Sequence, residues 1–253
     1  MRIAVCIKRV PDSGSRIRIA AGGLRIETAD LKFIISPYDE MAIEEGLRLK
    51  ESSGAGEILV ISLGPADVQA ILRQALAMGA DRAVHLLHEG PSGLELDGRQ
   101  CALALAQALR EEKPDLVLFG KSAIDDQNGQ VGALTAAELG IPCVGEVVRV
   151  EWSGQKFRLH HQLSGQIEVV EAAPPVAVTA QKGLNEPRYA GIKGIMAAKK
   201  KPLVQVPAAV GSPALELLGI EPPPPRRPGR IVGEGASAVD PLLELLHSEA
   251  KVI

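Results

Sequence analysis

Aromatic side chains are scarce in this chain, and their scarcity limits how a core can be built. The 253 residues include three Phe, two Tyr and one Trp. The interior must therefore be filled mainly by Val, Ile, Leu and Ala, which are aliphatic residues that folded proteins commonly bury. The length allows one large domain, or one domain with an appendage.

Close cysteine pairs, an excess of one charge and long apolar runs are also lacking. Cys6, Cys101 and Cys143 lie far apart, which supplies no metal motif and is typical of a reduced, cytosolic protein. The formal charge of −3 gives no reason to expect nucleic acid or a membrane surface as a partner. No apolar run approaches the roughly 20 residues that span a bilayer, and no signal or transit peptide is visible. We therefore expect a cytoplasmic protein without membrane insertion.

No catalytic or metal-binding constellation is recognisable. The five histidines show no metal-ligand spacing to cysteines or carboxylates, and no Ser/His/Asp or Cys/His arrangement can be argued. A dinucleotide-binding Gly-x-Gly-x-x-Gly after the first strand and a Walker phosphate loop are both missing. We predict no catalytic residues and no metal, which favours binding or electron transfer over hydrolysis.

Strand and helix patterns alternate over the first 145 residues. Apolar runs predict strands at residues 2–8, 57–62, 83–87 and 115–119. Apolar residues at helical spacing, together with cap and charge signals, predict helices at 39–50, 66–78, 99–112 and 129–139. Such alternation implies right-handed crossovers and a mostly parallel, nucleotide-binding, Rossmann-like α/β sheet flanked by helices.

The pattern changes after residue 145. Three strand-like runs at 146–152, 156–162 and 166–171, separated by Ser-Gly turns, predict an antiparallel meander at one edge of the sheet. Beyond residue 201 periodicity is lost, until a short helix is indicated at 240–247. We predict an α/β nucleotide-binding domain over residues 1–182, a projecting loop over 183–201 and an extended arm over 202–253.

The segment Leu184–Lys201 has an unusual composition for a loop. It contains Pro187, Gly191 and Gly194, which break regular strand pairing, and also Ile192, Ile195 and Met196, which proteins normally bury. It ends in three consecutive lysines. The segment is either a docking element for a partner, or a loop that folds back on its own core with Lys199–Lys201 solvated.

A ligand site is expected where the carboxyl ends of the parallel strands meet. Three segments should converge there: Cys6–Asp12, Leu63–Pro65 and Gly120–Gly132. In the third segment, a helix that starts near Asn128 would aim free amides at a phosphate, and Gly129 would allow the backbone to approach closely. We expect its two acidic residues, Asp125 and Asp126, to cap this helix or bind ribose hydroxyls, because a phosphate would repel them. An ordinary capped strand–helix loop is the alternative.

Five segments carry a resemblance to a known family, the beta subunits of electron-transfer flavoproteins. The matching segments are Val5–Asp12, Ser36–Glu40, Ala75–Arg82, Gly120–Gly132 and Asn185–Lys201. The resemblance runs over the whole chain and implies an adenine nucleotide alpha hydrolase-like fold. It also implies a heterodimer whose alpha subunit holds most of an FAD and supports the arm 202–253. This FAD would take electrons from acyl-CoA-type dehydrogenases and pass them to a quinone-linked oxidoreductase.

The resemblance further implies a nucleotide in this subunit. In the common type it is a structural AMP, and in the bifurcating type a second FAD takes its place, with NADH as the electron donor. Many bifurcating members have Gly-Asp-Thr where this chain has Asp126-Gln127-Asn128, so AMP is favoured. Matched by position, the site comprises Cys6, Ser36, Pro37, Tyr38, Asp39, Leu63, Gly120, Lys121, Ser122, Ala123, Ile124, Asp125, Asp126, Gln127, Asn128, Gly129, Gln130 and Val131.

The chain departs from the family pattern at several positions. The docking loop of the family uses one anchoring aliphatic residue, usually Leu, which is Ile192 here; Ile195 and Met196 would flank it. Lys193 replaces a common proline, which predicts a less rigid loop. Ser36 stands where Asn is common, and Ser13 stands where some members place a Tyr near the flavin.

Overall fold

The computed structural model describes residues 1–90, 96–226 and 228–253. The chain divides into two compact units, Met1–Ile220 and Glu221–Ile253. The larger unit contains the sheet and all the segments that were singled out as candidate sites. The smaller unit contains the helix α6 (Val239–Leu245), with a short 3₁₀ turn before it and a π-helical turn after it, close to the predicted helix at 240–247.

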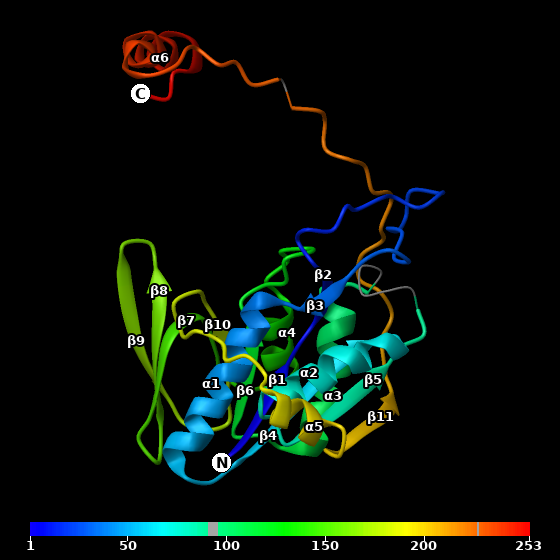
Figure 1. The fold of residues 1–253 in the computed structure, drawn as a ribbon. Helices are drawn as coiled ribbons and strands as arrows, with labels where there is room; N and C mark the ends of the chain where they lie inside the picture. Colours follow the sequence, from blue (N-terminus) through cyan, green and yellow to red (C-terminus); the bar gives the residue numbers. More distant parts are fainter. Residues whose placement is uncertain (91–95, 227) are drawn as a thin grey trace. The chain divides into compact units, whose positions relative to one another are not determined.

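The larger unit is built on a central sheet (Figure 1). Within the described residues this sheet has nine strands in the order β11-β5-β4-β1-β6-β10-β7-β8-β9. The strands are β1 (Arg2–Cys6), β4 (Glu57–Gly64), β5 (Arg82–Leu87), β6 (Leu116–Gly120), β7 (Cys143–Trp152), β8 (Phe157–Leu163), β9 (Gln166–Ala172), β10 (Val176–Ala180) and β11 (Leu203–Pro207). Pairing is parallel from β11 to β7 and antiparallel for β7–β8 and β8–β9. The predicted fold class is therefore confirmed, and so is the meander at one edge.

Both faces of the parallel strands are apolar and covered by helices. On β1, Ile3 and Val5 belong to one core cluster, while Ala4 and Cys6 belong to the other. The first cluster takes residues from α1 (Pro37–Ser53), α2 (Gln69–Met78) and α5 (Ile192–Ala198), and the second from α3 (Gly98–Glu112) and α4 (Val131–Leu139). Burial of successive residues on opposite faces is typical of a parallel sheet between two helical layers.

Local signals fix the helix ends. Asp97 caps α3 through a capping box: its carboxylate accepts a hydrogen bond from the Gln100 backbone amide, and the Gln100 side-chain oxygen accepts one from the Asp97 backbone amide. Gly79 ends α2 with φ 144°, a conformation that L residues with a Cβ avoid. These two helices lie within three residues of their predicted bounds.

Some elements differ from the prediction. The first strand ends at Cys6 rather than at residue 8, and α4 begins at Val131 rather than at 129. The short antiparallel pair β2 (Arg9–Pro11) and β3 (Phe33–Ile35) was not predicted, nor was β11. The division of the chain at residues 182 and 201 stays a prediction, as does the docking of the arm on a partner. In the described parts of the chain, no helix is both long enough and apolar enough to cross a bilayer.

Candidate functional site

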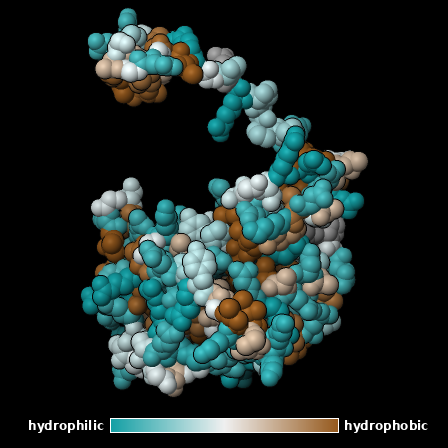
Figure 2. Space-filling model, viewed as in Figure 1, coloured by the Kyte–Doolittle hydropathy of each residue, from teal (hydrophilic) through white to brown (hydrophobic). Residues whose placement is uncertain are grey.

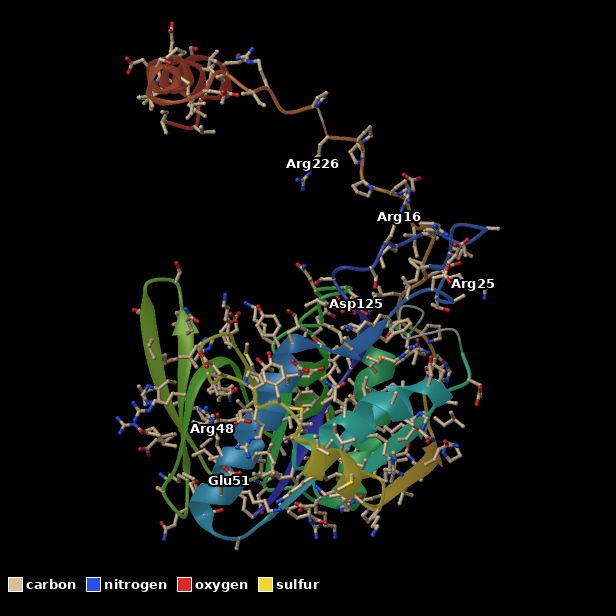
Figure 3. All side chains as sticks on the ribbon, in the orientation of Figure 1. Arg16, Arg25, Arg48, Glu51, Asp125 and Arg226 are labelled. Carbon is tan, nitrogen blue, oxygen red and sulfur yellow. The ribbon has the colours of Figure 1, made fainter. Side chains whose placement is uncertain are left out.

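A cleft of about 140 Å³ lies at the carboxyl ends of β1, β4 and β6. The three segments that the sequence singled out all contribute to its lining, so their predicted convergence is confirmed. Figure 3 shows Asp125 of the third segment beyond this end of the sheet. In the sheet, β1 lies between β4 and β6, so the carboxyl ends of these three parallel strands are adjacent. The segments that follow them therefore meet at one edge of the sheet.

Most of the predicted nucleotide-site residues line the cleft. They are Cys6, Asp39, Leu63, Gly120, Lys121, Ser122, Ala123, Asp125, Asp126, Asn128, Gly129, Gln130 and Val131. Ser36, Pro37, Tyr38, Ile124 and Gln127 are outside the lining. Ser36 is fully buried, and its hydroxyl has no hydrogen-bond partner within the described residues. Because Ser36 is enclosed and lies outside the lining, its hydroxyl is a buried unsatisfied group of the protein interior and is not open to a ligand in the cleft.

Asp39 ties the first turn of α1 to two strand ends. Its Oδ2 accepts the Lys8 amide at 2.7 Å, and its Oδ1 accepts the Gly120 amide at 2.9 Å. A Cβ on Gly120 would overlap this carboxylate, so the close approach requires glycine. Burial raises the pKa of Asp39 to about 7, although the two amides and Lys8 lower it.

The Lys8 side chain joins the first segment to the third. Its Nζ lies 2.9 Å from Asp125 Oδ1 and 2.9 Å from Asp126 Oδ2. Burial opposes the charge on Lys8, but the two carboxylates outweigh it and raise the pKa of this lysine. The expectation that the aspartates cap α4 is wrong, because the N-cap is Gln130 and no side chain bonds to the first amides. Both carboxylates pair with Lys8 instead, and their binding of ribose hydroxyls stays a prediction.

The start of α4 supplies uncommitted donors at the cleft. Gln130, Val131 and Gly132 all line it, and the helix N-terminus lacks a side-chain cap. The first amides of a helix have no partner within the helix and favour an anion. A Cβ at Gly132 would press on Thr179 and Phe119, so glycine lets this turn pack closely on β6 and β10. The donor set fits a nucleotide phosphate.

Sequence reasoning missed one wall of the cleft. Phe33 on β3 lies beneath the Arg9 guanidinium, 3.5 Å from the ring centroid, and Arg9 Nη1 pairs with Asp67 Oδ2 at 2.9 Å. The α3 residues Gly98 and Cys101 form a further part of the lining. Strands of three residues carry no periodic signal, so nothing in the sequence indicated that Phe33 would reach the cleft.

The cleft contains no activated nucleophile in the part that the structure describes. Cys6 and Cys101 line it, but burial raises the pKa of both thiols, that of Cys101 to about 11. Both thiols are therefore protonated at neutral pH and behave as apolar contacts. Over the described ranges, no three His, Cys, Asp or Glu side chains gather as a metal ion would require.

The loop 184–201 exposes its large apolar side chains except Leu184, which is buried. Ile192 is 79% exposed, Ile195 50% and Met196 61%. Figure 2 shows apolar surface over α5, the helix that bears all three. Tyr189, which the sequence analysis did not single out, is 99% exposed beside them. The alternative of a loop that folds back on its own core is correct for Leu184 and Ala198, which belong to a core cluster, but wrong for Ile192, Ile195 and Met196.

The loop is fastened at both ends. Arg188 forms a two-pronged pair with Glu44 at 2.7 and 3.0 Å and reaches Glu51 at 2.6 Å. Asn185 donates to Glu45 and to the Met41 carbonyl. These acceptors lie on α1, where Figure 3 labels Glu51 and its neighbour Arg48. The loop is thus anchored to a rigid helix through charge-assisted hydrogen bonds.

The second fastening is to α2. Gly194 lies so close to the Ala77 carbonyl that any Cβ would overlap it. Lys201 donates to the carbonyls of Leu76 and Ala80, at 2.9 and 2.6 Å. Lys201 therefore closes the end of α2, and the expectation that all three terminal lysines are solvated is wrong for this one.

Comparison with known proteins identifies the family. A family model described as the electron transfer flavoprotein domain matches residues 23–210. A beta subunit of the electron transfer flavoprotein from Bradyrhizobium diazoefficiens is 37% identical, with both chains fully covered. The beta subunit from Bacillus subtilis is also 37% identical over both full chains. The human beta subunit is 38% identical over 90% of this chain and 91% of its own. The chain belongs to the electron transfer flavoprotein family, among its beta subunits.

Proposed function

We propose that this chain pairs with an alpha subunit that holds most of an FAD, and that it carries a structural AMP itself. The complex takes electrons from acyl-CoA-type dehydrogenases and passes them to a quinone-linked oxidoreductase. The chain acts as an electron-carrier subunit and performs no reaction of its own. The observation that carries this proposal is the pairing, in one folded unit, of a nucleotide-type cleft whose described residues include no activated nucleophile and a fastened loop with exposed apolar side chains.

The cleft supports the AMP part of the proposal. The first amides of α4 would receive the phosphate. Asp125 and Asp126 are paired with Lys8, which offsets the repulsion that free carboxylates would exert on a phosphate. A bound nucleotide would thus complete a site that the protein has already shaped.

The loop supports the partner part of the proposal. An aliphatic side chain as exposed as Ile192 is unfavourable in water, and its burial in a partner's pocket contributes to binding. Tyr189, Ile195 and Met196 of the same loop add further exposed apolar surface. Because Arg188 and Lys201 hold the loop at both ends, little conformational freedom would be lost on docking.

The cofactors of the purified complex test the proposal. The chain is co-expressed with the alpha subunit proposed as its partner, the complex is denatured, and the released cofactors are identified by mass spectrometry. We expect one FAD and one AMP for each heterodimer. Two FAD and no AMP would contradict the AMP assignment and would indicate the bifurcating type. Absence of a stable complex would contradict the heterodimer.

A further inference from the structure

Glu146 has a backbone conformation that calls for an explanation. Its φ is 45°, in the left-handed region that residues with a Cβ seldom adopt. It lies in β7 where the pairing with β10 shifts register, between Val178 and Ala180. Such strain persists only where the surroundings fix it, and it is concentrated at functional sites.

Three contacts hold Glu146 in place. Its amide donates to the Thr179 hydroxyl at 2.9 Å, and its Oε2 accepts from Gln181 Nε2 at 2.8 Å. The same Oε2 lies 3.0 Å from Lys121 Nζ. Lys121 lines the cleft, whereas Glu146 does not. The strained residue therefore acts on the cleft through a lysine and forms no part of its wall.

The pairing of Lys121 completes a pattern. Each Lys or Arg that lines the cleft in the described part of the chain is matched by a carboxylate: Lys8 by Asp125 and Asp126, Arg9 by Asp67, and Lys121 by Glu146. One phosphate can be received by the amides of α4. Each additional phosphate adds negative charge and needs a cation that is not already neutralised.

We propose that Glu146 is a specificity-determining residue that, by pairing with Lys121, disfavours nucleotides with more than one phosphate. The inference rests on the proposed nucleotide function of the cleft. Of the carboxylates in these pairs, Glu146 is particularly suitable for a test. It can be changed without altering the lining of the cleft, whereas Asp125 and Asp126 are themselves lining residues.

Nucleotide affinities of the full-length chain test this role. AMP and ADP are titrated calorimetrically into nucleotide-free wild type and Glu146→Gln, which keeps the shape and removes the charge. We expect the ratio of the ADP to the AMP dissociation constant to fall about two- to fivefold, as suits a half-exposed ion pair. Glu146→Gly, which also relieves the positive φ, should lower the ratio similarly.

Two controls separate specificity from general effects of charge. Glu151 lies on the same strand as Glu146, and its carboxylate pairs with Arg149. Glu151→Gln removes that carboxylate and should leave the ratio unchanged. Adding Lys121→Met to Glu146→Gln should abolish the shift, because the released cation is then missing. If both Glu146 variants bind AMP with an unchanged ratio of the ADP to the AMP dissociation constant, the role of Glu146 is overturned and the proposed AMP site still stands. A wild-type chain that binds neither nucleotide would overturn the proposed AMP site, and this inference with it.

Discussion

At the scale of single residues, Asp39 is a group in the cleft whose pKa is shifted in opposite directions by burial and by hydrogen bonding. Both of its carboxylate oxygens accept backbone amides, from Lys8 and Gly120, which favours the charged form. Burial favours the neutral form and raises the pKa to about 7, above the 3.8 of an exposed aspartate. The group therefore binds its proton more tightly in the folded chain than in the unfolded one.

This shift predicts how stability depends on pH. Between pH 4 and 7 the folded chain holds more protons at Asp39 than the unfolded chain, so the free energy of unfolding falls as pH rises. Asp39→Asn cannot titrate and lacks this fall. Wild type should therefore lose stability relative to Asp39→Asn by at most about 1.4 kcal/mol per pH unit across this range. Urea unfolding at several pH values measures the difference.

A second aspartate provides the control for that experiment. The amide of Gly14 and the side chain of Lys32 lower the pKa of Asp12. Its contribution to stability is present above its unfolded pKa and is lost as pH falls through the folded one, the opposite sense to Asp39. Asp12→Asn should thus leave the slope between pH 5 and 7 unchanged. A difference between wild type and Asp39→Asn that does not vary with pH would contradict the account.

At the scale of elements, the packing of α5 on α2 decides how the apolar loop is presented. α5 has seven residues, too few for stability on its own. It is held because Gly194 permits contact with the Ala77 carbonyl and because Lys201 closes the end of α2. The loop can display Ile192 in a fixed position only while this packing persists.

Gly194→Ala tests that packing. The added Cβ meets a backbone carbonyl, which cannot rotate away, so α5 must shift from α2. We expect a loss of about 1–3 kcal/mol in the free energy of unfolding and faster hydrogen exchange across residues 188–201. Gly191→Ala is the matched control, because a Cβ there meets nothing within 4 Å and its φ of −76° suits any residue. Equal exchange in the two variants would show that α5 does not depend on Gly194.

The elements that the sequence predicted well are those with strong periodic signals. α2 and α3 combine an apolar stripe with a cap or a glycine stop, and both lie close to their predicted bounds. β2 and β3 have three residues each, and they form because the ends of β1 and α1 bring them together. β11 pairs with β5 at the sheet edge, where four of its five residues remain exposed, so its sequence carries no burial pattern that would predict a strand.

The candidate site was predictable to a similar degree. The strand ends that carry Cys6, Leu63 and Gly120 could be located, because parallel strands bring their carboxyl ends to one edge. The pairings of Lys8 and Lys121 could not be, because their carboxylate partners depend on how loops close in space. The exposure of Tyr189 likewise follows from the clamp on Arg188, a contact between residues more than 130 positions apart.

At the scale of the whole molecule, one helix serves both candidate surfaces. The first turn of α1 contributes Asp39 to the nucleotide-type cleft. Further along the same helix, Glu44 and Glu51 clamp Arg188 of the apolar loop. The cleft and the loop are thus built on a shared rigid helix, which fixes the positions of the cleft residue Asp39 and of the exposed apolar loop.

Electron transfer from a partner dehydrogenase to the complex with the alpha subunit tests the central claim most directly. Flavin reduction is followed by stopped flow for wild type, Ile192→Ala and Val204→Ala, the last a change at an exposed aliphatic residue on β11. Loss of a buried anchor costs about 2–4 kcal/mol. Ile192→Ala should therefore require at least tenfold more dehydrogenase for half-maximal rate, with an unchanged flavin spectrum, while Val204→Ala behaves as wild type. Unchanged kinetics in Ile192→Ala would contradict the docking role of the loop.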